Sequence, residues 1–335
     1  MTASLNHMTD NPCHGGDLAS AEARFGRPAG QWLDLSTGIN PNPYPITDFA
    51  PEALARLPQE PAETGLLGAA SAYFQLASNA AITAAPGTQA IIQWLPTLRT
   101  KARVGILGPT YAEHEFCWRA AGHSVDTLSA LPEPSDLDVC IAVNPNSPDG
   151  RRHDPAALLS LAQGLSANGG WLIVDEAFVD PHPELSLAGA AGQKGLIVLR
   201  SFGKFFGLAG LRLGFALGDA GIVEPLRRAI GPWAISGPAM EIGARAIMDA
   251  AWIDATRKNL RSAAARLNGL LAQHGLNVVG GTDLFRLVEH SNSKDLFRKL
   301  AEQGILTRSF DYREDWLRFG LPGNDADFER LHAAL

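Results

Sequence analysis

The sequence predicts an α/β protein, with a mostly parallel sheet in a large domain and a smaller α+β domain after it. Short apolar runs alternate with alanine-rich helical segments, which is the pattern of βαβ units. With 335 residues, 46% of them hydrophobic, the chain can bury one large core and a second, smaller one. We expect an N-terminal arm at 1–50, the large domain at 51–230, and an interdomain helix with the small domain at 231–335.

Two segments outside the alternating pattern mark its borders. Prolines punctuate Ser36–Pro45, and they exclude a regular helix or a central strand there, so we expect an arm that crosses the surface and joins the small domain to the binding site. After Gly231–Pro238, a long helical stretch rich in alanine, arginine and leucine reaches about Leu271. This stretch is expected to bridge into the small domain, which ends at Leu335.

Four apolar runs are expected to be strands of the sheet, namely Val104–Leu107, Val139–Val143, Trp171–Val174 and Leu196–Leu199. The alanine-rich segment Pro155–Ala167 is predicted to be one of the helices between them. The four runs are followed by Gly108-Pro-Thr-Tyr111, Asn144-Pro-Asn146, Asp175-Glu-Ala-Phe178 and Ser201-Phe-Gly-Lys204. Because ligands of open α/β sheets bind outside the carboxyl ends of the strands, these four segments should converge on one site.

Charge and cysteine content exclude several classes of protein. The net charge is −7, so the chain has no basic field for nucleic acid or an anionic membrane, and local arginines must meet any anionic ligand. The three cysteines (Cys13, Cys117 and Cys140) are far apart and lack metal-ligand spacing. Residues 1–10 lack a basic start and an apolar core, and no apolar run reaches the length of a membrane span. We expect a cytoplasmic protein without metal.

Lys204 is the most informative residue because it stands among glycines and aromatics directly after an apolar run. Partial removal of its ammonium from water favours the neutral amine, which can attack a carbonyl. The hydroxyl of Ser201 and the guanidinium of Arg212 can both bind one phosphate dianion. A lysine, a hydroxyl and an arginine around one phosphate predict pyridoxal 5'-phosphate. A glycine-rich loop with a solvated lysine is the alternative for this motif alone.

Other residues match the remaining needs of that cofactor. Asp175 can pair with the pyridinium nitrogen, Asn144 can donate to the phenolic oxygen, and Tyr111 can stack on the ring. Pro86–Gln89 precedes an apolar helical run whose free backbone amides would favour a phosphate. Each of these has an alternative when it is taken singly. Asp175 could be a helix cap or a metal ligand, and Asn144 could be a turn residue. Tyr111 could be a core aromatic, and the loop at 86–89 could be a simple N-cap.

In this order the motifs resemble those of fold-type-I pyridoxal phosphate enzymes over nearly the whole chain. The matching segments are His14-Gly-Gly, Ser36-Thr-Gly-Ile-Asn-Pro, Pro86-Gly-Thr-Gln, Asn144-Pro-Asn, Asp175-Glu-Ala-Phe, Ser201-Phe-Gly-Lys204, Gly210-Leu-Arg212-Leu-Gly and Trp316-Leu-Arg318-Phe. The chain is most similar to the histidinol-phosphate aminotransferase group. The N-terminal His-Gly-Gly points to the threonine-phosphate decarboxylase branch, which serves cobalamin biosynthesis.

The resemblance implies a role for each site residue. Lys204 would attach the cofactor covalently and Asp175 would pair with its ring nitrogen. The implied cofactor-binding residues are Gly87, Thr88, Gln89, Tyr111, Asn144, Asp175, Ser201, Lys204 and Arg212. The implied substrate-binding residues are His14, Gly15, Gly38, Asn144, Arg308 and Arg318. Arg318 matches the family's α-carboxylate arginine, and Arg308 matches one near a substrate phosphate, helped by His14 and the Gly15 amide. A surface salt bridge is the alternative for each arginine.

The implied reaction is decarboxylation of L-threonine O-3-phosphate to (R)-1-amino-2-propanol O-2-phosphate. An aminotransferase of the histidinol-phosphate type is the alternative, because it uses the same lysine, aspartate and arginines. A non-catalytic phosphate-binding or regulatory protein would keep the phosphate cradle without needing the lysine. The resemblance also implies a homodimer, and it leaves the next enzyme of the cobalamin pathway open as a partner.

The chain departs from the common family pattern at three places. The usual Asn-Pro-Asn-Asn-Pro-Thr-Gly reads Asn-Pro-Asn-Ser-Pro-Asp-Gly at 144–150. Phe178 replaces a tyrosine that is frequent at the end of the aspartate motif, which removes a hydroxyl near the phenolic oxygen. Leu57–Pro61 replaces a Tyr-Pro-Asp stretch that often lends a tyrosine to the partner subunit, so this stretch lacks the tyrosine for such a contact, and contacts across subunits stay open.

Overall fold

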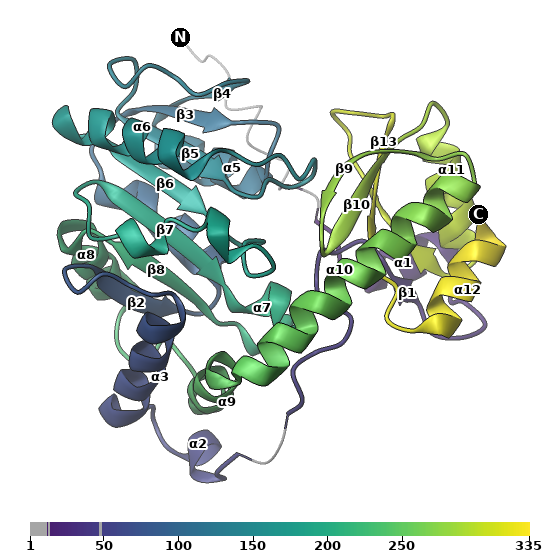
Figure 1. Ribbon diagram of the computed structural model, residues 1–335, viewed down its shortest axis with the longest axis horizontal. Coiled ribbons are helices and arrows are strands. Elements are labelled where there is room, and N and C mark those ends of the chain that lie inside the picture. The colour runs from purple at the N-terminus through teal and green to yellow at the C-terminus, as the bar shows by residue number, and fades with distance from the viewer. Residues whose placement is uncertain (1–11, 13, 47–48) are drawn as a thin grey trace.

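The structure is a computed structural model that describes residues 12, 14–46 and 49–335; Cys13 and residues 1–10, discussed above, lie outside that range. Figure 1 shows a large body beside a smaller one, with the long helix α10 (Ala250–Gln273) running from the first to the second. Each body has its own sheet, as predicted. The boundaries near residues 50 and 230 stay predictions.

The large body is built on a seven-stranded sheet in the order β2-β8-β7-β6-β5-β3-β4. The strands are β2 (Ala81–Ala85), β3 (Arg103–Leu107), β4 (Ser124–Leu128), β5 (Val139–Val143), β6 (Trp171–Asp175), β7 (Leu196–Ser201) and β8 (Gly214–Gly218). Strand β8 runs antiparallel to both of its neighbours, and the other pairs are parallel, so the predicted mostly parallel sheet is confirmed. The four runs predicted to be strands are β3, β5, β6 and β7, which lie side by side.

Helices cover both faces of this sheet, so its central strands are apolar on both sides. The large body holds the helices α2 (Glu52–Ala55), α3 (Glu60–Tyr73), α4 (Thr88–Trp94), α5 (Ala112–Ala120), α6 (Pro155–Ala167), α7 (Phe202–Phe205) and α8 (Ala220–Ile230), of which α2 lies away from the sheet. Helix α6 has the predicted bounds because Asp154 caps it, accepting a hydrogen bond from the Ala156 N–H at 3.2 Å, and Pro155 takes the first position.

The helical stretch predicted to reach Leu271 is two helices, α9 (Gly237–Met248) and α10. Asp249 separates them with a non-helical backbone (φ −83°, ψ 78°). Its carboxylate accepts hydrogen bonds from the Trp252 N–H at 3.0 Å and the Tyr44 hydroxyl at 3.3 Å. The aspartate therefore starts a new helix, because a side-chain cap satisfies an N–H that would otherwise lack a partner.

The smaller body holds a four-stranded antiparallel sheet in the order β12-β13-β10-β9. Its elements are β9 (Asn277–Thr282), β10 (Phe285–Glu289), α11 (Ser293–Glu302), β11 (Ile305–Leu306), β12 (Arg308–Ser309), β13 (Trp316–Gly320) and α12 (Asp325–Ala334). Strand β11 pairs outside this sheet, with β1 (Leu33–Asp34) of the N-terminal arm. Within the described residues, no helix is both long and apolar enough to cross a membrane.

The N-terminal arm runs over the surface in part, as predicted, and in part packs inward. It forms a largely exposed helix, α1 (Leu18–Phe25), and its proline-punctuated part is irregular, with buried and exposed residues side by side. Ser36, Asn40 and Tyr44 are at most 6% exposed. The Asn40 N–H donates to the carbonyl of Lys204 at 2.9 Å. The backbone of this irregular stretch therefore finds a hydrogen-bond partner in a neighbouring loop instead of in a helix or sheet. These buried residues therefore anchor the arm beside Lys204.

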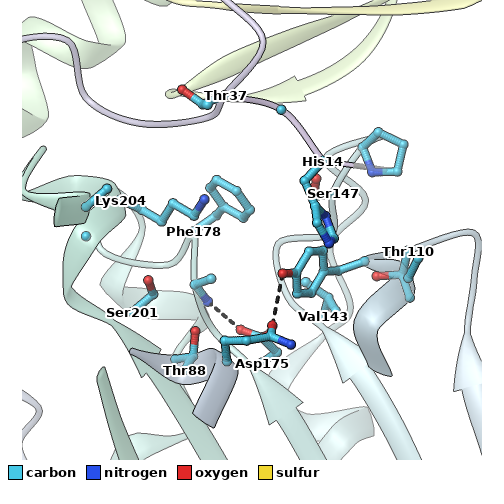
Figure 2. A pocket seen from close by; sticks show the side chains of 18 of the residues that line it. His14, Thr37, Thr88, Thr110, Val143, Ser147, Asp175, Phe178, Ser201 and Lys204 are labelled. Atoms are coloured by element: carbon cyan, nitrogen blue, oxygen red, sulfur yellow. Dashed lines mark hydrogen bonds between the residues drawn. The ribbon is translucent and has the colours of Figure 1, made fainter. Parts of the chain in front are cut away.

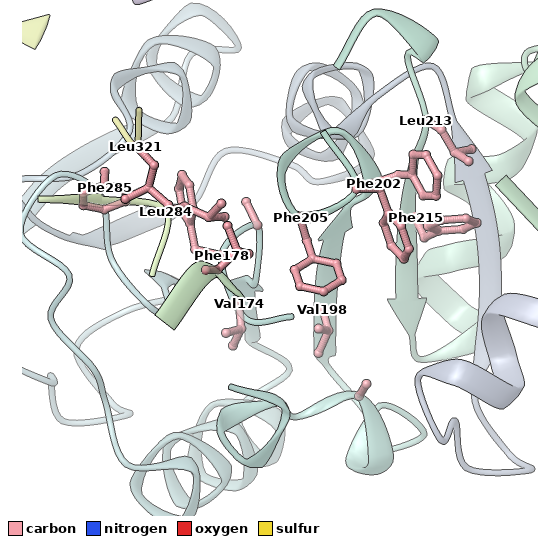
Figure 3. Close-up of a cluster of buried hydrophobic side chains, with 14 of the residues drawn as sticks. Val174, Phe178, Val198, Phe202, Phe205, Leu213, Phe215, Leu284, Phe285 and Leu321 are labelled. Carbon is pink, nitrogen blue, oxygen red and sulfur yellow. The ribbon is translucent and has the colours of Figure 1, made fainter. Parts of the chain in front are cut away.

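An aromatic cluster supports this region from below. Figure 3 shows Phe202, Phe205 and Phe215 gathered around the ends of the strands, near Val174 and Val198. A second group joins the two bodies, because the ring of Phe178 meets that of Phe285 at 5.2 Å between centroids. Close packing of this kind holds the loops after β6 and β7 in one arrangement.

A buried ion cluster also holds these loops. The guanidinium of Arg200, on β7, bonds the carboxylates of Glu176 and Asp180, and its side chain is 6% exposed. The Tyr73 hydroxyl donates to Asp180 at 3.0 Å, and Arg257 on α10 donates to the Asp180 carbonyl at 2.8 Å. The cluster thus joins the loop after β6 to β7, α3 and α10.

Replacing Arg200 with methionine should reduce the free energy of unfolding by about 3–5 kcal/mol, because two buried carboxylates lose their cation. Urea denaturation followed by circular dichroism measures this loss. The control is Arg103→Met, which breaks a solvent-exposed pair with Asp138 and should change stability little. Equal losses in the two variants would contradict the structural role given to the cluster.

Candidate active site

One pocket lies where β5, β6 and β7 end, between the two bodies. Of the residues that the sequence predicted, it is lined by His14, Gly15, Gly87, Thr88, Gln89, Tyr111, Asp175, Ser201, Lys204, Arg212, Arg308 and Arg318. Figure 2 shows Lys204 reaching into this pocket toward Phe178, with Asp175, Thr88 and Ser201 on its floor. Asn144 and Gly38 are the predicted residues that do not line it.

Lys204 lies on α7, directly after β7, where the chain turns back into the pocket. Burial of its amine lowers its pKa to about 8, and the cations of Arg318 and Arg212 contribute in the same direction while Asp175 opposes them. The amine nitrogen lies 5.7 Å from the centre of the Phe178 ring. The neutral, nucleophilic amine is therefore far more abundant near neutral pH than in a solvent-exposed lysine.

Asp175, at the end of β6, is 3% exposed. One carboxylate oxygen accepts a hydrogen bond from the Ala177 N–H at 3.0 Å, and the other lies 3.0 Å from Nε2 of the buried His114. The sequence analysis missed His114, although it follows Tyr111 by three residues, a spacing that places two side chains on one side of a helical turn. The carboxylate is therefore fixed in direction from two sides.

Gly87, Thr88, Ser201 and Arg212 form a cradle on the side of the pocket below Lys204. Gly87 has a positive φ of 81°, and a Cβ at this position would come within 2.4 Å of the Arg212 Nη2. The guanidinium thus packs directly on the bare backbone of the loop. Two hydroxyls and a guanidinium around this backbone make a donor set that fits a phosphate dianion.

Arg318, on β13, brings a partly buried cation from the small body. Its Nη1 donates to the Ser147 hydroxyl and its Nη2 to the Ser36 carbonyl, both at 2.8 Å, while its buried Nε has no hydrogen-bond partner among the described residues. Burial lowers its pKa to about 10, and nearby Arg308 contributes. Two guanidiniums this close favour a ligand with more than one negative charge.

The model of the family described as aminotransferase class I and II matches residues 62–335. The chain belongs to this family. A threonine-phosphate decarboxylase of Pseudomonas aeruginosa is 45% identical over 96% of each chain, and one of Sinorhizobium is 45% identical over 96% of this chain and 97% of its own. The histidinol-phosphate aminotransferase structure from Clostridium acetobutylicum has a TM-score of 0.78 at 22% identity, over 90% of this chain and 97% of that one. The predicted fold-type-I class is confirmed.

In this aminotransferase class I and II member, Asn144 does not face the pocket as predicted. Its side-chain oxygen accepts from the His153 N–H at 3.0 Å and its amide donates to the His153 carbonyl at 3.3 Å, so it braces its own loop. Ser147 lines the pocket instead, at the position where the common motif has its third asparagine. That departure from the motif was the signal that could have identified Ser147.

Gly38 also lies outside the pocket lining. A Cβ at this position would come within 2.8 Å of the Phe178 ring. The glycine therefore lets the arm pack against the back of that ring, which itself lines the pocket. Its role is one of close packing, and a substrate contact for Gly38 has no support in the geometry.

The remaining residues fit pyridoxal 5'-phosphate. Lys204 can attach the cofactor's carbonyl carbon, the carboxylate of Asp175 can pair with a protonated ring nitrogen, and the cradle with Arg212 can hold the phosphate. Tyr111, half-exposed over the pocket, offers a flat face to the ring. The arrangement can thus hold a carbonyl cofactor with an anionic substrate beside it.

Lys204 of the cofactor-free protein should react with an amine reagent such as trinitrobenzenesulfonate at a rate that rises with pH, with a midpoint near pH 8. Only the neutral amine attacks, so the rate follows its fraction. Arg318→Gln should move the midpoint to higher pH, because it removes a cation, and Asp175→Asn should move it to lower pH. Peptide mass spectrometry measures labelling, with Lys101 in the same digest as a reference. Shifts in one common direction would contradict this electrostatic account.

Proposed function

We propose that this protein is a pyridoxal phosphate-dependent threonine-phosphate decarboxylase. It would convert L-threonine O-3-phosphate into (R)-1-amino-2-propanol O-2-phosphate and carbon dioxide, within cobalamin biosynthesis in the cytoplasm. The observation that carries the proposal is that two guanidiniums, Arg308 and Arg318, enter the same pocket as Lys204. A substrate with both a carboxylate and a phosphate meets that pair of cations, and the relatives of 45% identity are named for this activity.

Each residue then has a task that follows from its position. Arg318 binds the substrate carboxylate, and Arg308 binds the phosphate with His14 and the Gly15 amide. When bound, pyridoxal phosphate supplies the electron sink for the electrons of the broken bond. Asp175 keeps the ring nitrogen protonated. The Lys204 amine, once displaced from the cofactor by substrate, can return a proton to Cα.

The rings of Phe178 and Phe310, which line the pocket, help to exclude water from this reaction. The same lysine, aspartate and arginines would also serve an aminotransferase. The two reactions differ in which bond of Cα stands perpendicular to the ring, and this depends on how Arg318 and Arg308 orient the substrate.

Purified, cofactor-loaded protein should release carbon dioxide and aminopropanol phosphate from L-threonine O-3-phosphate without any oxo acid. Lys204→Ala should abolish this release, because Lys204 is the one lysine among the described residues that line the pocket. Carbon dioxide capture and phosphate-sensitive chromatography follow both products. No release, with amino transfer appearing once 2-oxoglutarate is added, would place the protein with the aminotransferases.

We also propose a homodimer, supported by an exposed apolar surface made by α2, the turn after it and the segment before α9. Leu54, Leu57 and Trp233 are each at least 59% exposed. Pro58 lies in a shallow groove with Trp233, and Leu57 lines another groove along α9. Large apolar side chains gathered on a surface are typical of a subunit interface.

Trp233→Glu should therefore weaken self-association by at least tenfold, since it places a charge in the apolar interface. Sedimentation equilibrium of the holoenzyme measures the dissociation constant. Val279→Glu, at a similarly exposed apolar position on β9 of the smaller body, is the matched control and should leave it unchanged. A monomeric parent protein, or an unchanged constant for Trp233→Glu, would contradict this interface.

A further inference from the structure

Glu113 is a buried carboxylate at the edge of the pocket that the proposed reaction does not use. It lies in the first turn of α5, with a side chain 10% exposed. Its two oxygens are engaged separately. One is 2.7 Å from Nε2 of His14, and the other accepts a hydrogen bond from the Gln89 amide at 2.6 Å. Burial of a carboxylate is costly unless such partners compensate it, so both contacts are firm.

These contacts join three segments that are far apart in the sequence. His14 belongs to the N-terminal arm, Gln89 to the start of α4, and Tyr111 immediately precedes α5. The side-chain oxygen of Gln89 accepts from the Tyr111 hydroxyl at 3.0 Å, and the rings of His14 and Tyr111 lie 5.7 Å apart. Figure 2 shows His14 on the side of the pocket that carries Ser147 and Thr110, across from Lys204. Glu113 thus contacts His14 of the arm and Gln89 at the start of α4 directly, and through Gln89 it is linked to Tyr111.

The arm has a second anchor beyond His14. The Gly16 N–H donates to the Ser36 hydroxyl at 2.7 Å, and a Cβ on Gly15 would come within 2.3 Å of the Ser36 carbonyl. That same carbonyl accepts from Arg318. Residues 14–16 are therefore fixed at two points: His14 contacts Glu113, and Gly16 contacts Ser36. Ser36 in turn bonds Arg318.

We propose that Glu113 is a positioning residue for substrate binding, whose carboxylate fastens the His14 arm across the pocket as a wall for the phosphorylated end of the substrate. The inference rests on the proposed function for the identity of that substrate. The carboxylate does not itself bind the phosphate, because two like charges would repel. It acts through His14, which lies between Glu113 and the pocket.

Glu113→Gln tests this role because it removes the charge while keeping the size of the side chain. In the holoenzyme without substrate, amide hydrogen exchange at residues 14–16 should accelerate about tenfold, as expected for loss of a charge-assisted hydrogen bond. The KM for L-threonine O-3-phosphate should rise by a similar factor while kcat stays within about twofold, since the arm contributes binding. Glu115→Gln, on the same helix but bonded at the surface to Arg119, should change neither.

A double-mutant cycle separates positioning from general damage. If Glu113 acts through His14, then Glu113→Gln should add little to the KM of His14→Ala. Additive effects, a fall in kcat alone, or unchanged exchange at residues 14–16 would overturn the proposal. If Glu113→Gln does not fold, exchange in His14→Ala decides, because His14 is a partly exposed side chain: acceleration supports the anchor and no change refutes it.

The exchange measurement also keeps this inference distinct from the proposed function. It uses no substrate and no turnover, so it reports whether Glu113 holds the arm even if L-threonine O-3-phosphate is not decarboxylated. Faster exchange without any decarboxylation would retain the anchor and refute the reaction. Decarboxylation with unchanged exchange would support the reaction and refute the anchor.

Discussion

Arg200 is buried between Glu176 and Asp180, and its position determines where the chemical groups of the pocket lie. Asp175 immediately precedes Glu176, and Ser201 immediately follows Arg200, so two of the three cluster residues have a pocket residue as their neighbour in the chain. Successive side chains of a strand point to opposite faces, so on β7 Arg200 enters the ion cluster while Ser201 enters the pocket. Arg257 extends the cluster to α10, the helix that leads to the small body. The register between Asp175 and Ser201 is thus tied to the placement of the small body.

The small body in turn influences the chemistry of the large one through charge. Arg318 lowers the pKa of the Lys204 amine, second only to burial. A substrate carboxylate bound to Arg318 would neutralise that cation and so raise the proton affinity of the amine. The amine is therefore most nucleophilic before substrate arrives, when it must bond the cofactor. It becomes a better proton carrier once substrate is bound, which is when the proposed reaction needs a proton at Cα.

The sequence was most informative where structure is local. The strand ends before Asp175 and Lys204 follow from short apolar runs, and these two residues lie where predicted. Asn144 was placed in the pocket from its motif, but its direction depends on a loop that closes on His153. His114 and Glu113 could not be identified, because their partners Asp175 and His14 lie 61 and 99 residues away in the sequence. Each alone is an ordinary helix residue, and only the fold makes either one part of the site.

The contacts of Arg318 also bear on why the proposed reaction removes the substrate carboxylate instead of retaining it. An arginine with both Nη groups unengaged grips a carboxylate with a bidentate fork and stabilises the ground state, which opposes decarboxylation. Here Nη1 is bonded to Ser147 and Nη2 to the Ser36 carbonyl, and Nε is buried, so a substrate must share Nη atoms already in use. Arg318 is thereby rigid, which orients the substrate well, yet its hold on the carboxylate is limited. Firm orientation with a limited grip suits a group that must depart as neutral carbon dioxide.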